Sequence, residues 1–501
     1  MKGKLARGMV WIGAARVLIN LIGLVSTLLL ARLLLPEDFG LVAIAMTFVT
    51  IVGSVTELSL SSALIQHEAP SEAHYDTAFT LSVARSLLLG ATVVAFAWPV
   101  GWLYGDPRLV PVLLAIAACM AVSGFGNPRM VMFTRRLQFW QDFVFGVSTK
   151  LVGFLVAVAV AYFYRSYWAL VISNAVIQLH VLTLSYLFLP RRPRFSLVGW
   201  RDLMGFSIWM SLEQAVNTLN WRADTLFIGY FLGSRPLGYY NFGDNLAAMP
   251  TREATAPIAQ TLFPAFSRLN GDPPRLRQAY QRAQAMLCAV ALPLGFGFAA
   301  LAEPLVLAAV GAKWQPAVIV IQVLSGLFAV QTLASSAHPL AMAMGKTRLL
   351  FRISLVSLLI RVPLIVAGLA TGGLVGVVYA RVVSGLIGTV ISLALVRHLL
   401  DLPIVRQLSA NIRSFAAVAA MCGVLALVPR VLPESLGTAH IAGIAVLIVA
   451  GGTTYGAALL GLWLVAGRPP GPEAEALELL ARLRTRINRK TDKIVPYEQN
   501  F

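Results

Sequence analysis

Charged residues are scarce in this chain of 501 residues: they make up 12% of it, about half the share of an ordinary soluble domain. Hydrophobic residues make up 58%, and the mean hydropathy is +0.76. So few polar side chains cannot cover the surface of a soluble globule of this size. The composition therefore excludes a soluble protein and predicts a polytopic membrane protein.

Motifs that carry chemistry are also missing. The three cysteines, Cys119, Cys288 and Cys422, lie far apart in apolar runs, so they predict no disulfide framework and no metal site. The six histidines are scattered without ligand spacing. The tripeptide GKT at 345–347 lacks the upstream glycine of a phosphate loop, since Leu340 stands there. We expect no metal, no cofactor and no covalent catalysis, and H+ or Na+ coupling is an open source of energy.

Long apolar segments are what the chain has instead. A bilayer core of about 30 Å needs roughly 20 apolar residues per helix, and fourteen segments of that length are present. The eighth is the weakest because it carries three charges and three prolines. Their limits are 9–34, 40–66, 79–103, 109–133, 141–163, 167–190, 203–232, 238–265, 284–310, 315–343, 348–370, 373–399, 411–431 and 439–466.

Basic residues outnumber acidic ones by 40 to 22, and their placement explains the excess. With fourteen spans, 27 of the 40 fall in the loops on one side of the membrane and six on the other. Short cytoplasmic loops are enriched in Lys and Arg. The alternation therefore predicts that both termini are cytoplasmic, and the basic clusters are topology signals rather than a site for nucleic acid.

A short internal repeat marks two similar halves. Residues 27–40, TLLLARLLLPEDFG, align with 225–238, TLFIGYFLGSRPLG, with four identities. Both stretches end the first helix of a six-helix set and turn through Pro and Gly on the same predicted side. Because six spans return the chain to one side, the copies insert with the same orientation and are related by a pseudo-two-fold axis along the membrane normal.

The sequence thus predicts an all-α polytopic membrane protein with about fourteen transmembrane helices and four parts. An N-terminal six-helix lobe (1–200) and a C-terminal six-helix lobe (201–400) enclose a central cavity. Two appended transmembrane helices (401–468) and a cytoplasmic tail (469–501) follow. Within the tail, residues 473–490 have the spacing of an amphipathic helix on the membrane surface.

Two stretches resemble a known family. LLLARLLLPEDFGLVAIAMTF, followed by TELSLSSALIQ at 56–66, is similar to the polysaccharide-exporter branch of the multidrug/oligosaccharidyl-lipid/polysaccharide exporter superfamily. The opening of the second lobe, FSIWMSLEQAVNTLNWRADTLFIGYFLGSRPLGYYNFGDNLAAMP at 206–250, resembles the same family. The likeness covers both lobes.

The resemblance implies a multi-pass flippase of the bacterial cytoplasmic (inner) membrane. Such a protein moves a polyprenyl-diphosphate-linked oligosaccharide from the inner to the outer leaflet by rocking two lobes. Its product serves lipopolysaccharide, exopolysaccharide or other cell-surface polysaccharide biosynthesis. The implied partners are the lipid-linked glycan and a polysaccharide polymerase or export machinery.

Basic side chains inside the predicted spans are the candidates for substrate binding. Each costs about 2.5–3.5 kcal/mol at mid-bilayer, and such groups usually face the bundle interior or water. Arginine suits a diphosphate because it offers planar paired donors and keeps its charge without hydration. Arg16 is the leading candidate because it lies one turn from Asn20, as Glu213 does from Asn217 in the second lobe. The full set is Arg16, Asn20, Arg85, Lys150, Asn217, Arg222, Arg252, Arg361 and Arg381.

Acidic residues at similar depth are candidates for ion coupling or for ion pairs. Arg222 and Asp224 are two positions apart and do not share a helix face, so structural pairing across helices and contact with substrate both remain open. The acidic candidates are Glu57, Glu213, Asp224, Asp244 and Glu253.

Two other functions compete with the flippase. A cation-coupled multidrug or toxin antiporter of the same superfamily needs intramembrane carboxylates, and Glu57, Glu213 and Asp224 could serve. The basic excess of the predicted interior favours an anionic cargo over a cationic drug. A membrane enzyme, such as a polymerase or glycosyltransferase, needs a large loop outside the membrane, and no loop here is long enough. We therefore expect a secondary-type transporter, not an enzyme.

Overall fold

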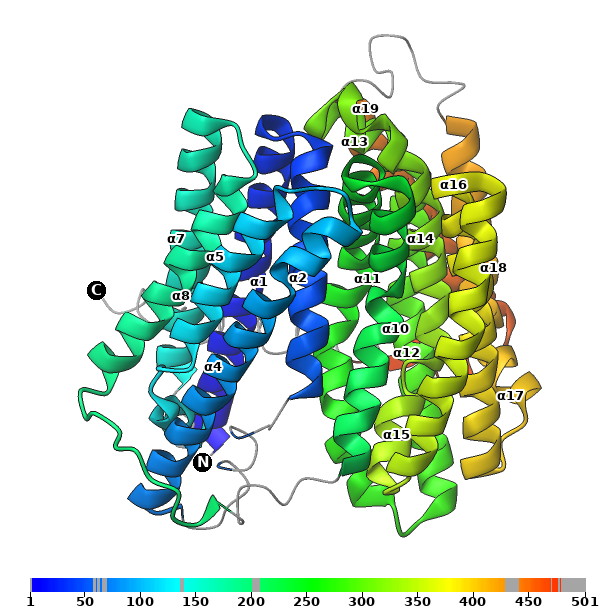
Figure 1. Cartoon of the computed structure of the whole chain (residues 1–501). Helices are drawn as coiled ribbons and strands as arrows, with labels where there is room; N and C mark the ends of the chain where they lie inside the picture. Colours follow the sequence, from blue (N-terminus) through cyan, green and yellow to red (C-terminus); the bar gives the residue numbers. More distant parts are fainter. Residues whose placement is uncertain are drawn as a thin grey trace, which may run out of the picture. The chain divides into compact units, whose positions relative to one another are not determined.

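All regular structure in the described part of the chain is helical (Figure 1). In this computed structural model the described residues are 2–56, 60, 64, 70–135, 139–200, 208–428, 441–469, 471–475 and 478. The predicted tail helix 473–490 lies largely outside these residues, and Glu57 lies outside them as well.

Nine helices among the described residues are long and apolar enough to cross a bilayer, and two shorter apolar helices accompany them. The multi-span all-α fold is thereby confirmed, while the exact number of fourteen spans stays a prediction. The principal helices are α1 (Lys2–Leu33), α2 (Pro36–Val55), α4 (Glu72–Leu103), α5 (Leu109–Ser123), α7 (Phe139–Tyr164), α8 (Trp168–Phe188), α10 (Ile208–Leu232), α11 (Ser234–Leu269), α12 (Pro273–Ala300), α13 (Ala302–Val310), α14 (Gln315–Gln331), α15 (Ala337–Ala343), α16 (Thr347–Leu400), α17 (Ile404–Ser409), α18 (Ile412–Leu427) and α19 (Ile441–Val465).

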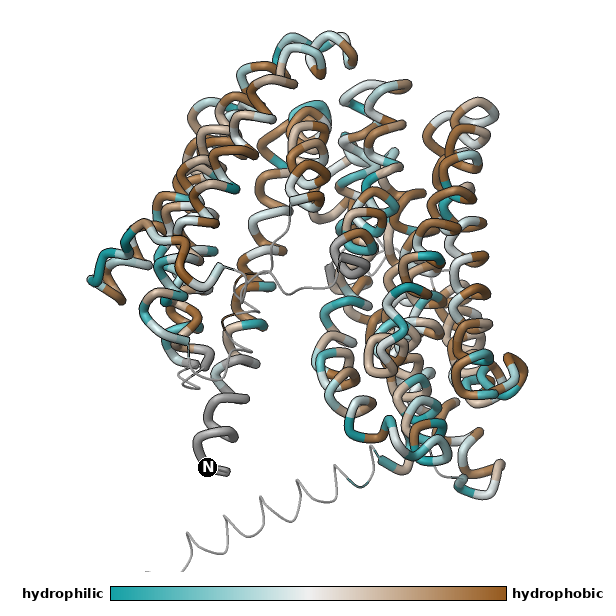
Figure 2. Tube along the Cα trace, turned by 60° about the horizontal axis from the view of Figure 1, so that its bottom comes forward, coloured by the Kyte–Doolittle hydropathy of each residue, from teal (hydrophilic) through white to brown (hydrophobic). Residues whose placement is uncertain are grey.

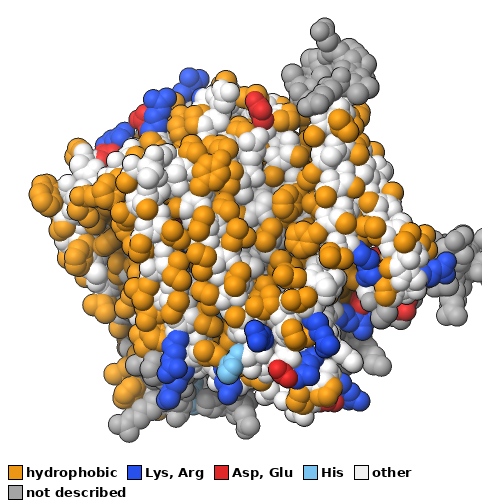
Figure 3. Space-filling view, turned by 90° about the vertical axis from the view of Figure 1, so that its right-hand side faces the viewer, with side chains coloured by type: hydrophobic (Ala, Val, Ile, Leu, Met, Phe, Trp, Pro, Cys, Tyr) orange, Lys and Arg blue, Asp and Glu red, His pale blue; other side chains and the backbone are white. Residues whose placement is uncertain are grey.

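The helices keep large apolar side chains on their outer surfaces, as a bilayer requires. Trp102 is 86% exposed and Phe163 is 77% exposed. Hydrophobic residues run along most helices, and hydrophilic ones gather mainly toward helix ends and connections (Figure 2). On the face drawn in Figure 3, hydrophobic side chains cover most of the middle, and Lys and Arg lie at the upper left, along the lower edge and at the right-hand side. Lipid is the solvent that such a surface matches.

Helix α16 accounts for two predicted spans in one 54-residue element. Its backbone leaves helical geometry at Gly372 and Gly373, where the φ of Gly373 is +54°. On the two sides of this kink Gly368 and Gly376 meet backbone to backbone, since a Cβ added to Gly376 would lie 1.9 Å from the carbonyl oxygen of Gly368. The glycines therefore let the chain reverse and pack against itself.

The described chain forms two compact units. Unit 1 comprises Met1–Phe242, Ala309–Ala317 and Thr347–Ala380, and unit 2 comprises Gly243–Ala308, Val318–Lys346 and Arg381–Phe501. Within unit 1, α1 packs on α7, α7 on α8, α8 on α5, and α5 on α4, while α2 packs on α10. Within unit 2, α12 packs on α18, and α18 on α19. The predicted division into lobes at residues 200 and 400 remains a prediction.

The two turns of the internal repeat meet each other inside unit 1. A Cβ added to Gly40 would lie 1.7 Å from the carbonyl oxygen of Ser234, and one added to Gly238 would lie 1.8 Å from that of Pro36. In the repeat alignment Gly40 corresponds to Gly238, and Pro36 to Ser234. The contact of Gly40 with Ser234 and the contact of Gly238 with Pro36 are therefore equivalent in the repeat. A local two-fold axis generates reciprocal contacts of this kind.

We expect Gly40→Ala to lower the free energy of unfolding by about 1–3 kcal/mol, because the new methyl group would overlap a carbonyl of α11 and force the backbones apart. The matched control is Gly53→Ala on the same helix, where a Cβ meets nothing within 4 Å. Removing a helical glycine there should be neutral or slightly stabilising. Thermal unfolding in detergent measures both, and equal effects of the two substitutions would contradict the proposed close contact.

Candidate functional site

Unit 1 holds most of the predicted site residues. Arg16 and Asn20 lie on α1, Arg85 on α4 and Lys150 on α7. Asn217, Arg222, Glu213 and Asp224 lie on α10, and Arg361 lies on α16. Unit 2 holds Asp244, Arg252, Glu253 and Arg381.

Helix α1 carries a polar stripe that meets a lysine of α7. Arg16, Asn20 and Gly23 follow one another at the spacing of one helix face, and the two polar side chains are half-buried. The ammonium nitrogen of Lys150 lies 3.6 Å from the position that a Cβ on Gly23 would take. Because Gly23 has no side chain, the lysine can lie along this face of α1. No salt bridge of Lys150 is found among the described residues.

Asp224 forms a buried ion pair with Arg361. The Nε of Arg361 donates to Oδ1 of Asp224 at 3.1 Å, and its Nη2 lies 2.5 Å from Oδ2. The phenol of Tyr240 donates to the same Oδ2 at 2.6 Å. Asp224 is 2% exposed and Arg361 is 8% exposed. Of the two roles left open for Asp224, structural pairing across helices is the one that the structure contains, while Arg222, half-buried two positions earlier, takes no part in this pair.

The repeat allows a comparison of Lys150 with Arg361 by span only. Lys150 and Arg361 stand in corresponding spans of the two predicted lobes, the fifth and the eleventh. In the alignment that pairs Thr27 with Thr225, the residue corresponding to Asp224 is Ser26. The first copy therefore has a serine where the second has the carboxylate that neutralises its arginine. Among the described residues Arg361 has Asp224 as its counterion, and no salt bridge of Lys150 is found.

Glu213 and Asn220 belong to the contact between α10 and α16. The hydroxyl of Ser354 donates to Oε1 of Glu213 at 3.2 Å, and the amide of Asn220 donates to the carbonyl oxygen of Ser354 at 3.0 Å. Glu213 is 3% exposed, while Asn217, one turn farther along, is half-buried. These contacts fix α10 against the first half of α16.

Arg85, Arg252 and Arg381 make contacts within their own units. Arg85 donates to the carbonyl oxygen of Gly53 at 3.0 Å, at the carboxyl end of α2, where a cation is favourable. In unit 2, Arg252 pairs with the adjacent Glu253 at 3.0 Å, and Asp244 is half-buried. The guanidinium of Arg381, 2% exposed, lies 5.9 Å over the ring of Phe328. Among the described residues, no group of three or more His, Cys, Asp or Glu side chains could hold a metal ion.

A clasp at the end of α1 was not predicted from the sequence. The Lys313 ammonium donates to the carbonyl oxygens of Arg32 and Leu34 at 2.7 and 2.8 Å. The indole of Trp314 donates to the carbonyl oxygen of Ala31 at 2.8 Å, and this indole is fully buried. The last carbonyls of a helix have no partner within the helix, so these two side chains cap α1. The only hint in the sequence is the glycine at position 311, two residues before Lys313. In the structure Gly311 has a φ of +88° and turns the chain there.

A second contact of the same kind ties the connection after α4 to α10. The phenol of Tyr104 donates to the carbonyl oxygen of Leu226 at 3.3 Å, and Gly105 turns the chain with a φ of +64°. Burial raises the pKa of the Tyr104 phenol to about 12, so it stays protonated and able to donate. Burial also raises the pKa of Asp106, but hydrogen bonds from Arg108 outweigh that effect and leave the pKa below its ordinary value.

We expect Asp224→Asn or Arg361→Gln alone to lower the free energy of unfolding by about 3–5 kcal/mol, because each leaves one buried charge without its partner. The double variant should cost clearly less than the sum of the two single ones. Tyr240→Phe is the control, and losing one hydrogen bond should cost about 1 kcal/mol. Thermal unfolding in detergent measures the cycle, and additive single effects would show that the two groups are not coupled.

Known proteins resemble the chain over most of its length. Lipopolysaccharide biosynthesis protein WzxC of Escherichia coli (strain K12) is 24% identical over 400 residues, which cover 78% of this chain and 80% of that protein. Succinoglycan biosynthesis transport protein ExoT of Rhizobium meliloti (strain 1021) is 28% identical over 441 residues, 87% of each chain.

Solved structures share the fold at low identity. A lipid II flippase, MurJ, in an inward closed conformation has a TM-score of 0.72 at 13% identity and covers 92% of this chain and 100% of its own. An inward-facing multidrug resistance MATE transporter has a TM-score of 0.56 at 14% identity, over 79% of this chain and 98% of its own. A family profile described as "Polysaccharide biosynthesis protein" matches residues 29–319, more than half of the chain. The chain belongs to this polysaccharide biosynthesis protein family.

Proposed function

We propose that this protein is a flippase that carries a polyprenyl-diphosphate-linked oligosaccharide from the inner to the outer leaflet of the bacterial cytoplasmic membrane, for cell-surface or exopolysaccharide assembly. Family membership supports this function, and so do relatives named for lipopolysaccharide and succinoglycan biosynthesis and for transport. The chain shares its fold with a solved lipid II flippase, and many transporters built from repeats alternate access to a site between their halves. Both termini lie in the cytoplasm in this proposal.

The contrast between Lys150 and Arg361 carries the proposal. An ionised side chain at membrane depth costs about 2.5–3.5 kcal/mol on insertion scales. Asp224 offsets that cost for Arg361, and no acidic residue of the described chain does so for Lys150. A diphosphate beside Lys150 would neutralise the lysine and shed its own water against fixed donors. Arg16 and Asn20, on the same face of α1, add a planar cation and an amide for the head group.

The antiporter alternative fits the described carboxylates less well. Exchange of a proton or sodium ion needs an acidic group that can release its partner during each cycle. Asp224 is held by Arg361 and by Tyr240, and Glu213 accepts a hydrogen bond from Ser354. Coupling of flipping to H+ or Na+ and association with a polymerase remain parts of the proposal that need separate tests.

We expect Ser26→Asp to abolish most transport, because it supplies in the first repeat the carboxylate that Asp224 supplies in the second and would pair with Lys150. A lost charge-assisted contact with the cargo corresponds to roughly a tenfold or larger drop in rate. The measurement is the amount of lipid-linked sugar that accumulates on the cytoplasmic leaflet of cells producing each variant.

Ser26→Asn is the matched control, of similar size but without charge, and should leave transport near the level of the unaltered protein. Lys150→Gln should resemble Ser26→Asp, and Lys150→Arg should restore part of the activity. Unimpaired transport by both Ser26→Asp and Lys150→Gln would rule out a cargo-binding role for this lysine.

The clasp at the end of α1 is the proposed closure on the outer side. The side chain of Arg32 donates to the carbonyl oxygen of Ala309, beside the contacts of Lys313. In a background with Cys119, Cys288 and Cys422 replaced by Ala, a short reducible linker between Arg32→Cys and Ala309→Cys should arrest transport. Transport should return after reduction, and each single-cysteine variant treated alike should be unaffected. Full activity of the linked protein would show that these segments do not separate during transport.

A further inference from the structure

The segment between the two predicted lobes, residues 190–200, forms a linker strap that lies along the first turns of α4. The backbone of the strap makes three hydrogen bonds with side chains of α4: Arg194 N to Asp76 Oδ1 at 3.1 Å, Ser196 N to Thr80 Oγ1 at 2.9 Å, and Thr77 Oγ1 to Val198 O at 2.7 Å. Because the strap contributes only backbone atoms to these bonds, substitutions of its exposed arginines leave the three bonds in place.

Positive charge gathers on one part of the strap. Arg191, Arg192 and Arg194 are exposed. Arg191 lies 3.5 Å from the carboxylate of Glu72, and the buried Arg129 pairs with that same carboxylate. Two guanidinium groups therefore share one acid. The Nε of Arg129 makes no hydrogen bond within the described part of the chain, so this corner has an excess of unsatisfied donors and of positive charge.

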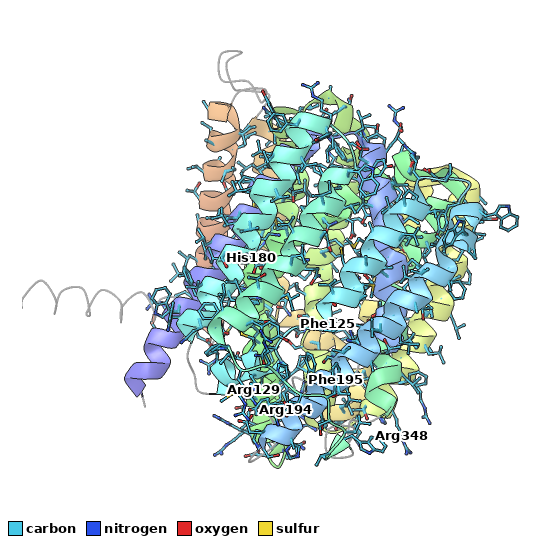
Figure 4. All side chains as sticks on the ribbon, turned by 60° about the vertical axis from the view of Figure 1, so that its left-hand side comes forward. Phe125, Arg129, His180, Arg194, Phe195 and Arg348 are labelled. Carbon is cyan, nitrogen blue, oxygen red and sulfur yellow. The ribbon has the colours of Figure 1, made fainter. Side chains whose placement is uncertain are left out.

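Large apolar side chains lie next to these arginines. Phe195 is 70% exposed, Leu197 is 59% exposed and Val198 is 67% exposed. The ring of Phe195 touches that of Phe79 with centroids 5.4 Å apart, so it has a fixed base on α4. Arg129, Arg194 and Phe195 lie close together toward the lower end of the helices in Figure 4. Cations and apolar groups thus alternate within a few residues of a fixed backbone.

We propose that the linker strap binds an anionic phospholipid of the bilayer leaflet that adjoins the start of α4 and the end of α8. The phosphate would lie against Arg191, Arg192 and Arg194, and the upper acyl chains against Phe195, Leu197 and Val198. Helix α8, a candidate membrane span, ends at Phe188, two positions before the strap, which would place the strap at the level of the lipid head groups. Basic residues beside exposed aromatic and aliphatic ones are the composition of segments that lie in the membrane interface.

This occupant matches both chemical components of the surface. A soluble acidic partner would satisfy the arginines but leave three large hydrophobic side chains in water. A neutral lipid would cover the hydrophobic side chains but leave the excess charge at Arg129 and Arg191. The lipid in this proposal is a resident of the bilayer and is distinct from the transported cargo.

The test measures binding of phosphatidylglycerol to the purified full-length protein by native mass spectrometry, with phosphatidylcholine as the neutral lipid. The triple variant Arg191→Gln, Arg192→Gln, Arg194→Gln should bind phosphatidylglycerol on the order of tenfold more weakly, since each surface cation contributes to attraction of anionic lipid. Binding of phosphatidylcholine should not change. The backbone bonds to α4 predict an unaltered unfolding temperature.

The matched control removes three exposed arginines elsewhere, in Arg268→Gln, Arg275→Gln, Arg406→Gln. An equal loss of phosphatidylglycerol in this control would mean that net charge alone attracts the lipid, and it would overturn the proposal. If the first triple variant fails to fold, the double variant Arg192→Gln, Arg194→Gln leaves the contact of Arg191 with Glu72 in place and should still show weaker binding.

Two further arms probe the apolar half of the lipid site and its independence from the cargo. Phe195→Ser with Leu197→Ser should weaken phosphatidylglycerol binding without removing charge, and unchanged binding in this variant would overturn the apolar part of the site. Undecaprenyl diphosphate serves as the cargo-like competitor. If it binds the strap and phosphatidylglycerol does not, the surface belongs to the cargo pathway and the proposal is wrong, whatever the outcome for Ser26 and Lys150.

Discussion

The close contact between two turns, at Gly40 and Gly238, is the constraint on which the arrangement of unit 1 depends. Each glycine lies so near a carbonyl of the other turn that no side chain fits between them. This contact holds the start of α2 against the start of α11, and α2 also packs on α10. In the same unit the ring centroid of Trp314 lies 5.3 Å from that of Phe39 and 4.2 Å from that of Phe242, and its indole N–H donates to the carbonyl oxygen of Ala31.

Much of this architecture can be predicted from the sequence, because a bilayer requires long apolar helices. The enrichment of Lys and Arg in cytoplasmic loops then predicts which loops lie on the same side of the membrane. The similarity of residues 27–40 to 225–238 predicted the repeat, and the reciprocal glycine contact agrees with it. Partners were harder to predict. Asp224 and Arg361 are 137 positions apart, and a helix periodicity tells which face a residue occupies but not which helix it meets. The capping role of Lys313 was hidden for a simpler reason: its acceptors are backbone carbonyls, which every residue has.

The difference between the two repeats bears most directly on function. A symmetric protein would place equivalent charges in both halves, and each would find the same partner. Here Arg361 is neutralised by Asp224, while the first repeat carries Ser26 at the position aligned with Asp224, one turn from the Gly23 against which Lys150 lies. Replacing a buried ion pair by a lone cation lowers stability unless an anion joins it. In the proposed function, a negatively charged cargo supplies beside Lys150 the neutralisation that Asp224 supplies for Arg361.

The clasp at the end of α1, which is the proposed closure, is built from interactions other than ion pairs, and such interactions suit repeated opening. Near it, Gly40 and Gly238 contact backbone carbonyls, and the ring of Trp314 packs on that of Phe242. The Trp314 indole and the Lys313 ammonium donate to carbonyl oxygens at the end of α1. Water can replace the Lys313 ammonium on the exposed carbonyl of Arg32 at little net cost, because a typical intramolecular hydrogen bond contributes only about 1 kcal/mol. Separating Asp224 from Arg361 would instead strand two charges in a dry interior. Movement is therefore cheaper at the clasp than at the ion pair, so the helices should part at the end of α1 while α10 and the first half of α16 move as one body.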